Sequence, residues 1–300
     1  MAQRFPSVAL IGATGNLGAP VLQALLQAQP PFEYITVLTR SAPSNPSVYP
    51  PNVHVKVVDY ASKDSLISAL TGVDALVSTV APGSIDVQKT TIDAAVAAGV
   101  KFFVPSEFGL ASNDNRLNRD FDDWASKVEI QQYLAGQPIE YTLIFTGLFL
   151  DWGMQGFLLN LKKKTVELWD DGEAVLALTT VGSIGKAVVS VLEGKAGGKT
   201  EVRVKDIQLS QRRLFELAQE AVGSEGWTVT KLDTAAAHAL AKENVKNGLR
   251  DVSYAFLKRA ISGGYGSLWG AEEDDSETLG LKEWTKKDVV ELVKKLAEEK

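Results

Sequence analysis

A glycine-rich loop near the start of the chain restricts the fold more than any other feature. It follows the apolar run Ser7–Ile11 and precedes a segment with apolar residues at helical spacing. Glycines in this context allow a tight turn, a close approach of the backbone to a pyrophosphate, and close packing of helix on strand. The spacing is GxxGxxG rather than GxGxxG, but the strand, loop and helix are the context that such a motif requires. We therefore expect a dinucleotide to bind here rather than a turn with packing glycines alone, through Gly12, Thr14, Gly15, Asn16, Leu17 and Gly18.

Short β-branched runs alternate with helical patterns after this loop, which is typical of parallel strands joined by crossover helices. The sequence predicts an α/β fold: a doubly wound parallel sheet of the Rossmann, NAD(P)-binding type with a smaller C-terminal α+β substrate lobe. We place the dinucleotide-binding domain at residues 1–152 and the substrate lobe at 153–300, with a strand at 201–209 rejoining the main sheet. We expect the other strands at 7–11, 34–39, 54–58, 75–79, 102–105 and 141–145, and helices beginning near 18, 64, 87 and 122.

The second half of the chain has weaker patterns. We expect a helix near 183–192, a helix that Ser210 caps, an acidic loop at 272–277 and a final amphipathic helix at 286–300. The stretch 146–153 carries large apolar groups where a surface loop would carry polar ones. We therefore expect Phe149 and Trp152 to wall a cleft for a flat substrate, with core packing as the alternative for both.

The residue after the second predicted strand indicates which dinucleotide binds. NAD-preferring proteins place an acid there for the ribose 2′-hydroxyl, whereas this chain has Arg40, and the nearby acid Glu33 precedes the strand. A guanidinium can donate two hydrogen bonds to a 2′-phosphate, which an acid would repel. We therefore expect NADP(H) as the cofactor, with Arg40 as the selecting residue and a solvated surface arginine as the alternative.

Two loops follow the fourth and fifth predicted strands. In this architecture ligands lie across the carboxyl ends of the strands, so both loops are expected at the cofactor. The loop 78–83 would contact it mainly through its backbone, or serve only as a turn. The segment 105–109 would lie against the nicotinamide, with Ser106 bonding a substrate oxygen and Glu107 ordering the loop, or merely shape the pocket. The predicted cofactor contacts are Thr79, Val80, Ala81, Pro105 and Ser106, and the predicted substrate contacts are Glu107 and Phe108.

The residues for proton transfer are less obvious. Short-chain reductases usually carry Tyr-x-x-x-Lys, and the match Tyr254 to Lys258 lies far beyond the sixth predicted strand. We interpret it as a coincidence of helical spacing. In the helix before that strand, where the motif belongs, Lys127 is present and the tyrosine is absent.

Together, the glycine loop, Arg40, the segment 105–109, Lys127 and Pro138–Thr142 resemble the NmrA-like and isoflavone reductase-like proteins. These atypical short-chain dehydrogenases/reductases include plant phenylcoumaran benzylic ether and pinoresinol–lariciresinol reductases. The resemblance implies NADPH, a small aromatic or phenolic substrate, and a proton-transferring lysine, which is Lys127 here. An oxidised nicotinamide beside this lysine disfavours its charged form and so favours proton exchange. The alternative is a helix lysine that holds a ribose hydroxyl of the cofactor or nothing.

These observations favour an NADPH-dependent reductase with Lys127 as the catalytic residue. The runner-up, which the NmrA branch of the family implies, is a non-catalytic NADP-sensing regulatory protein, in which Lys127 has no evident purpose. A nucleotide-sugar epimerase is a third hypothesis, weakened by the missing tyrosine.

Composition limits the partners. The formal net charge is −6 and the basic residues are dispersed, so we expect neither nucleic acid nor an anionic membrane as a partner. The chain has no cysteine and only two histidines, His54 and His238, which argues against disulfides, thiolate nucleophiles and the usual zinc sites. Residues 1–6 show no basic stretch before an apolar run, and no apolar run nears the roughly 20 residues of a membrane span. A cytoplasmic location is therefore expected, with monomer and homodimer both open.

Overall fold

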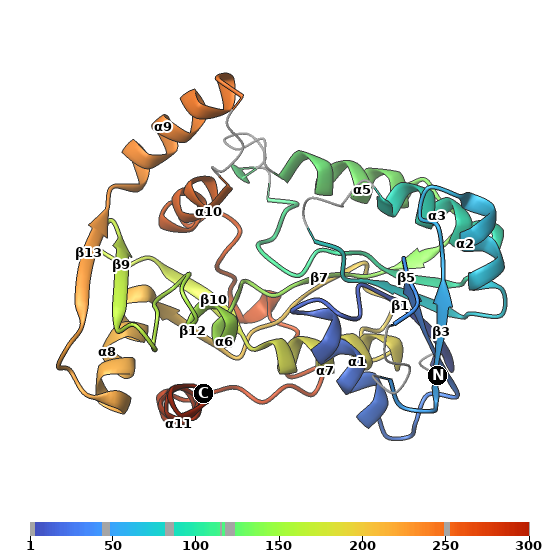
Figure 1. Cartoon of the computed structure of the whole chain (residues 1–300), viewed down its shortest axis with the longest axis horizontal. Helices are drawn as coiled ribbons and strands as arrows, with labels where there is room; N and C mark the ends of the chain where they lie inside the picture. The colour runs from blue at the N-terminus through green and yellow to red at the C-terminus, as the bar shows by residue number, and fades with distance from the viewer. Residues whose placement is uncertain are drawn as a thin grey trace.

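The fold is organised around a six-stranded parallel sheet (Figure 1). The computed structural model describes residues 4–43, 49–81, 87–114, 116–117, 124–248 and 253–299. In the strand order β3-β2-β1-β4-β5-β6, the chain adds β2 and β3 on one side of β1 and then β4, β5 and β6 on the other. Sheets of this kind bind ligands at such a switch point, at the carboxyl ends of the strands on either side of it. The strands are β1 (Ser7–Ile11), β2 (Tyr34–Thr39), β3 (Val53–Val57), β4 (Ala75–Ser78), β5 (Phe102–Val104) and β6 (Glu140–Tyr141).

Helices cover both faces of this sheet, so the predicted doubly wound fold is confirmed (Figure 1). On one face lie α2 (Lys63–Leu70), α3 (Val87–Ala97) and α5 (Ala125–Ala135), and on the other α1 (Gly18–Gln27) and α7 (Val181–Leu192). Coverage on both sides explains why all five residues of β1 are buried and apolar or small. The helix predicted to begin near 122 is described from Ala125, and residues 118–123 lie outside the described residues.

Helices α1 and α7 pack closely at Gly185. A Cβ atom there would lie 2.9 Å from the Pro20 carbonyl oxygen and 3.0 Å from the Ala24 Cβ, whereas one at Gly182 would meet nothing within 4 Å. We predict that Gly185→Ala lowers the free energy of unfolding by about 1–3 kcal/mol, because the two helices must separate. Gly182→Ala, on the same helix, should leave it unchanged or raise it by up to about 1 kcal/mol. Urea unfolding of both variants checks this, and equal stabilities would contradict the packing argument.

Two strands expected as continuous are each divided. The expected strand 141–145 consists of β6 and β7 (Leu143–Phe145), and the expected strand 201–209 consists of β11 (Glu201–Arg203) and β12 (Ile207–Ser210). The first of these two strands, β11, pairs in parallel with β7, the strand directly after β6 in the sequence. The second, β12, pairs antiparallel with β10 (Val175–Thr179). Between them the Val204 N–H donates to the Phe145 carbonyl and the Asp206 N–H to the Leu178 carbonyl. The backbone thus changes hydrogen-bonding partner in the middle of the predicted strand, at the charged pair Lys205 and Asp206.

The second half forms smaller sheets and a second core. β8 (Leu148–Phe149), β10 and β12 make a three-stranded sheet, and β9 (Thr165–Trp169) pairs in parallel with β13 (Thr228–Leu232). As predicted, the Ser210 side chain caps a helix, because its Oγ accepts the Arg213 N–H at 3.1 Å. The remaining helices are α6 (Leu150–Gly153), α8 (Gln211–Val222), α9 (Thr234–Lys246), α10 (Ser253–Ser262), η4 (Ala271–Glu273) and α11 (Lys286–Glu298).

The chain passes more than once between the hydrophobic cores of the main sheet and the hydrophobic core formed mostly by the second half. Trp124 and Leu148, from the first half, belong to the second core, while α7, from the second half, belongs to the core beneath the main sheet. The predicted domain boundary between residues 152 and 153 therefore stays a prediction.

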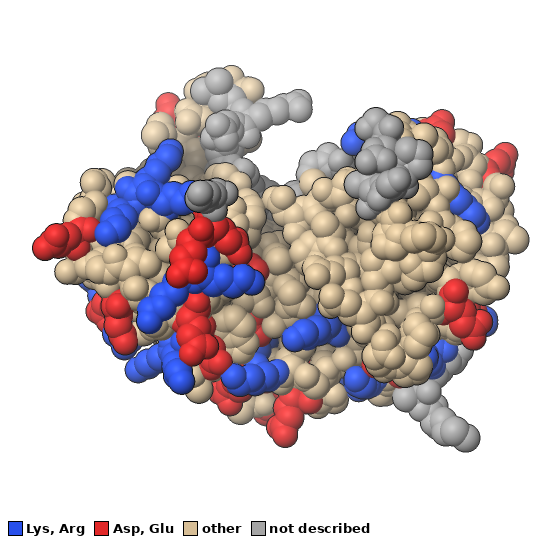
Figure 2. All heavy atoms as spheres, turned by 60° about the horizontal axis from the view of Figure 1, so that its bottom comes forward, with Lys and Arg blue, Asp and Glu red and all other residues tan. Residues whose placement is uncertain are grey.

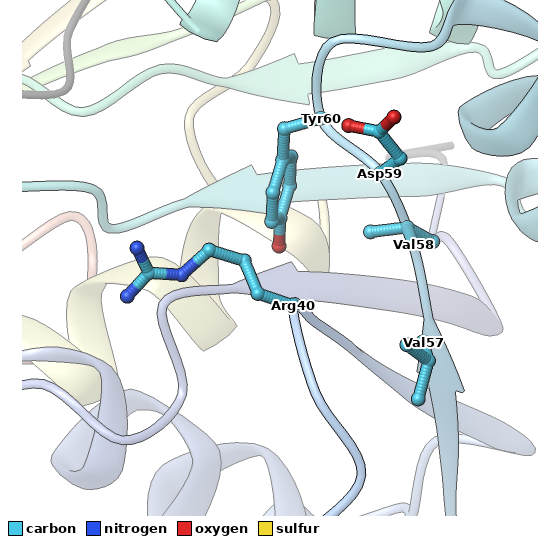
Figure 3. Close-up of a pocket in the computed structure, with 5 residues that line it drawn as sticks. All are labelled: Arg40, Val57, Val58, Asp59 and Tyr60. Carbon is cyan, nitrogen blue, oxygen red and sulfur yellow. The ribbon is translucent and has the colours of Figure 1, made fainter.

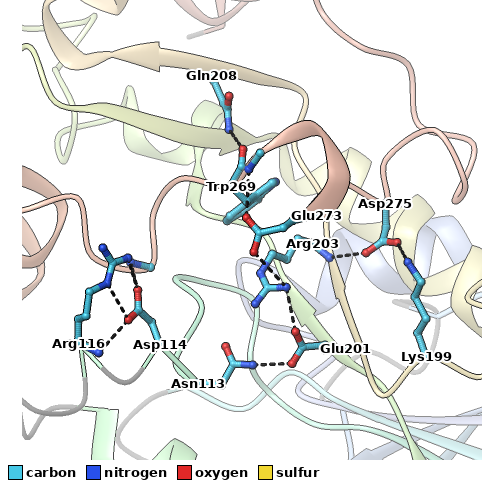
Figure 4. A network of polar contacts seen from close by, with 12 residues as sticks. Asn113, Asp114, Arg116, Lys199, Glu201, Arg203, Gln208, Trp269, Glu273 and Asp275 are labelled. Atoms are coloured by element: carbon cyan, nitrogen blue, oxygen red, sulfur yellow. Dashed lines mark hydrogen bonds and ion pairs between the residues drawn. The ribbon is translucent and has the colours of Figure 1, made fainter.

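The acidic stretch 272–277 lies against β11 (Figure 4). Asp274 forms a parallel bridge with Arg203, and the Asp275 carboxylate accepts the Arg203 N–H at 3.0 Å and a bond from Lys199. The Arg203 guanidinium also pairs with Glu201 at 2.9 Å. This stretch, expected to be a loop, includes part of η4 and covers an edge strand with charged groups, which keeps that edge from pairing with another chain.

Candidate cofactor and substrate site

The glycine loop leaves no room for side chains where it meets β4. Gly12 has φ +84°, and a Cβ atom there would lie 2.7 Å from both the carbonyl oxygen and Oγ1 of Thr79. A Cβ atom at Gly18 would lie 1.9 Å from the Gly12 carbonyl oxygen. Thr79 donates its hydroxyl to the Ile11 carbonyl at 2.7 Å, which fixes the end of β4 against the loop. The glycine loop and the end of β4, each of which the sequence predicts at the cofactor, therefore lie side by side.

The N-terminus of α1 is open toward ligands. Thr14, Gly15 and Asn16 are exposed, and Leu17 at the N-cap provides no side-chain cap. The Gly15 N–H bonds the Gly12 carbonyl at 2.9 Å, which closes the turn. A helix N-terminus without a cap presents free backbone N–H groups, and these suit a pyrophosphate. The residues here fit a dinucleotide.

A cavity of about 460 Å³ lies at the carboxyl end of β2, beside Arg40 (Figure 3). The Tyr60 hydroxyl donates to the Leu38 carbonyl at 2.9 Å, so its ring stands beside the exposed Arg40 side chain. Burial raises the pKa of Tyr60 to about 12, against the lowering effect of the Arg40 charge, so this phenol is neutral. The cavity combines an aromatic ring and apolar groups, which suit an adenosine, with a guanidinium, which suits a 2′-phosphate. The Asp59 carboxylate also lines it and lies away from the Arg40 guanidinium (Figure 3). The residues that line the cavity are Arg40, Val57, Val58, Asp59 and Tyr60.

The segment 105–109 forms a strained turn after β5. Ser106 is held on both sides: its N–H donates to Gln88 Oε1 at 2.7 Å and its hydroxyl donates to the Val80 carbonyl at 2.8 Å. Phe108 has φ +37°, in the left-handed region that a phenylalanine seldom adopts, and its N–H donates to the Ile144 carbonyl at 3.0 Å. Such strain persists only where the surroundings enforce it, and it concentrates at functional sites.

Lys127 reaches this turn from α5. Its side chain is 17% exposed, its amine donates a hydrogen bond to the Glu107 carbonyl oxygen, and Nζ lies 3.7 Å from Glu107 Oε2. A Cβ atom at Gly109 would lie 3.8 Å from the same amine. The structure thus brings together Lys127 and the turn that the sequence predicted beside the nicotinamide.

Sequence reasoning missed Ser112 and Gln131, which bond the side chain of Glu107. The Glu107 side chain, 2% exposed, points into the protein and accepts bonds from Ser112 Oγ at 2.7 Å and Gln131 Nε2 at 2.9 Å. The signal for Gln131 was its position four residues after Lys127, which puts both on one face of α5. Substrate contact by Glu107 stays a prediction.

The two predicted cleft aromatics lie at the start of the second half. Phe149 is half-buried and packs, like Leu17, against the core beneath the main sheet. Trp152 is also half-buried and stacks on Phe157 at 6.5 Å between ring centroids. Phe157 in turn contacts Tyr254 at 5.1 Å. The surface is hollowed between the two halves of the molecule in Figure 2. Phe149 and Trp152 each pack against other residues and are also partly exposed, so their contact with a substrate stays a prediction.

Two other kinds of site are absent from the described residues. Among the described residues, no group of three or more histidine, aspartate or glutamate side chains could hold a metal ion. None of the helices in the described ranges is both long and apolar enough to cross a membrane. Figure 2 shows basic and acidic side chains interspersed on one face.

Comparisons with known proteins show the family and the fold of this chain. The model of the NmrA-like family matches residues 6–179. The oxidoreductase aprR of Aspergillus flavus is 31% identical over 91% of this chain and 94% of its own, and phenylcoumaran benzylic ether reductase PT1 of Pinus taeda is 28% identical over 62% and 64%. The complex of leucoanthocyanidin reductase with NADPH from Vitis vinifera has the same fold, with a TM-score of 0.78 at 20% identity over 95% and 99% of the chains.

Proposed function

This chain belongs to the NmrA-like family and is an oxidoreductase, and from that premise we propose that it is an NADPH-dependent reductase of small aromatic or phenolic substrates. The observation that carries the proposal is the half-buried Lys127 amine, held at the carboxyl edge of the sheet by the Glu107 carbonyl. An amine in that place can transfer a proton to a bound substrate, a step that a protein that only senses NADP does not need.

We assign residues of this chain to each part of the cofactor. The N–H groups of the glycine loop would hold the pyrophosphate, and Arg40 the 2′-phosphate. The loops after β4 and β5 would flank the nicotinamide ring, through Thr79, Val80, Ala81, Pro105 and Ser106. NADPH bound in this way supplies a hydride. Phe149 and Trp152 would cover the substrate and exclude water.

Lys127 completes the reduction. A hydride that reaches a carbon of the substrate leaves negative charge on an adjacent oxygen, and the Lys127 ammonium group donates its proton to that oxygen. The lysine then recovers a proton from solvent. The sum is substrate, NADPH and one proton giving reduced substrate and NADP⁺.

The direct test is loss of NADPH absorbance with a panel of phenolic ketones, enones and benzylic ethers. We expect turnover with at least one class. Tight binding of NADPH without turnover of any compound would contradict the reductase and favour an NADP sensor.

Arg40 gives a separate test of cofactor choice. Arg40→Ala removes the charge-assisted interaction with the 2′-phosphate, for which we take about 1.5–3 kcal/mol in total because Arg40 is exposed. We predict an affinity for NADPH that is roughly 10- to 100-fold lower, with the affinity for NADH unchanged because NADH lacks that phosphate. Titration of both cofactors measures this, and an unchanged NADPH affinity would show that Arg40 is only a surface residue.

A further inference from the structure

A buried polar network lies directly behind Lys127. Both carboxylate oxygens of Glu107 accept bonds from the protein, Oε1 from Gln131 and Oε2 from Ser112. Gln131 Nε2 also donates to Ser112 Oγ at 2.7 Å, so each of the three side chains bonds both of the others. A carboxylate that is 2% exposed is costly to bury unless it is paired and hydrogen-bonded. The network therefore holds this carboxylate in one position.

The position of the carboxylate is coupled to that of the amine. The Lys127 amine bonds the main-chain carbonyl of Glu107 and lies 3.7 Å from its carboxylate, so one residue contacts it twice. The backbone on the far side is fixed as well, because Phe108 adopts φ +37° and bonds Ile144. Any movement of Glu107 would displace the point to which the amine is attached.

We propose that Gln131 and Ser112 are positioning residues for the reaction, which act by holding Glu107 so that Glu107 orients the Lys127 amine toward the substrate. The proposal rests on the proposed function, because it needs Lys127 as the proton donor. Gln131 and Ser112 each donate a hydrogen bond to the Glu107 carboxylate, and the bond between them does not involve Lys127, so both residues act on the amine through Glu107. Displacement of a reacting group by about 1 Å can cost on the order of 100-fold in rate.

The variant Gln131→Met removes both donated bonds and keeps a side chain of similar length. We expect kcat to fall about 10- to 100-fold, with the KM of the substrate and the Kd of NADPH within about threefold of the native values. The matched control is Gln132→Met, because Gln132 is the exposed neighbour on α5. It should behave as the native protein.

A double variant separates positioning from simple packing. If Gln131 acts through the amine, Lys127→Arg/Gln131→Met should be no slower than Lys127→Arg alone, because the amine is already gone. Losses that multiply would show a structural role and overturn the proposal. Should Gln131→Met fail to fold, Ser112→Ala replaces it. This variant removes the bond to the Glu107 carboxylate and the bond accepted from Gln131, and loss of the carboxylate bond alone predicts a roughly fivefold lower kcat, again with no further loss on Lys127→Arg.

The outcomes distinguish this proposal from the function on which it rests. Native turnover in Lys127→Arg would overturn the proposed proton transfer itself. An inactive Lys127→Arg together with a native kcat in Gln131→Met, or in Ser112→Ala where that replaces it, would overturn the positioning network alone.

Discussion

Lys127→Arg is expected to abolish most turnover while NADPH still binds. Arginine keeps a positive charge beside the buried Glu107 carboxylate, but a guanidinium does not release its proton at accessible pH. Proton transfer by a positioned side chain contributes roughly 10²- to 10⁴-fold to a rate. We therefore predict a loss of kcat in that range, with the Kd of NADPH within about threefold of the native value. Steady-state kinetics and cofactor titration measure the two quantities.

Lys127→Met is the companion variant, because it removes the charge as well as the proton. It leaves the Glu107 carboxylate, 2% exposed, without its nearby cation, so the free energy of unfolding should fall on the order of 1–3 kcal/mol. Lys127→Arg should lose activity without that loss of stability. A Lys127→Arg protein that turns over at the native rate would assign the lysine a structural role only.

Gly18→Ala is expected to disable the cofactor site and destabilise the protein. The new Cβ atom would lie 1.9 Å from the carbonyl oxygen of Gly12 and 2.6 Å from its carbonyl carbon. Both are backbone atoms, so no change of side-chain rotamer relieves the clash, and the loop or α1 must move. We predict a loss of about 2–4 kcal/mol in the free energy of unfolding, as for severe overpacking, and no measurable binding of NADPH.

Gly15→Ala separates the two effects of Gly18→Ala. A Cβ atom at Gly15 would meet only the Gly12 carbonyl oxygen, at 3.3 Å, so the fold should accept it. The same atom would stand where the loop approaches a pyrophosphate, so the NADPH affinity should fall with little change in melting temperature. Native NADPH affinity in both variants would show that the loop does not hold the cofactor.

The predicted strands were most accurate where the local pattern leaves one solution. The bounds of β1 and β2 match the prediction, since each contains four or five consecutive buried residues. The stretch 201–209 mixes apolar with charged and polar residues, and its two ends pair with different strands, β7 and β10. The residue pattern predicts that such a stretch is extended, but it does not indicate which strand pairs with it. Pairing depends on strands more than 20 residues away in sequence.

The sequence by itself determined the doubly wound sheet, the glycine loop and the family, because these depend on local periodicity and on steric limits that only glycine satisfies. It also predicted Lys127 and the turn 105–109, but as separate features. Only the tertiary structure decided that the Lys127 amine bonds the Glu107 carbonyl, and that Gln131 and Ser112 hold the Glu107 carboxylate. Hydrogen bonds between side chains on different elements are set by how those elements pack, and no spacing along the chain encodes that geometry.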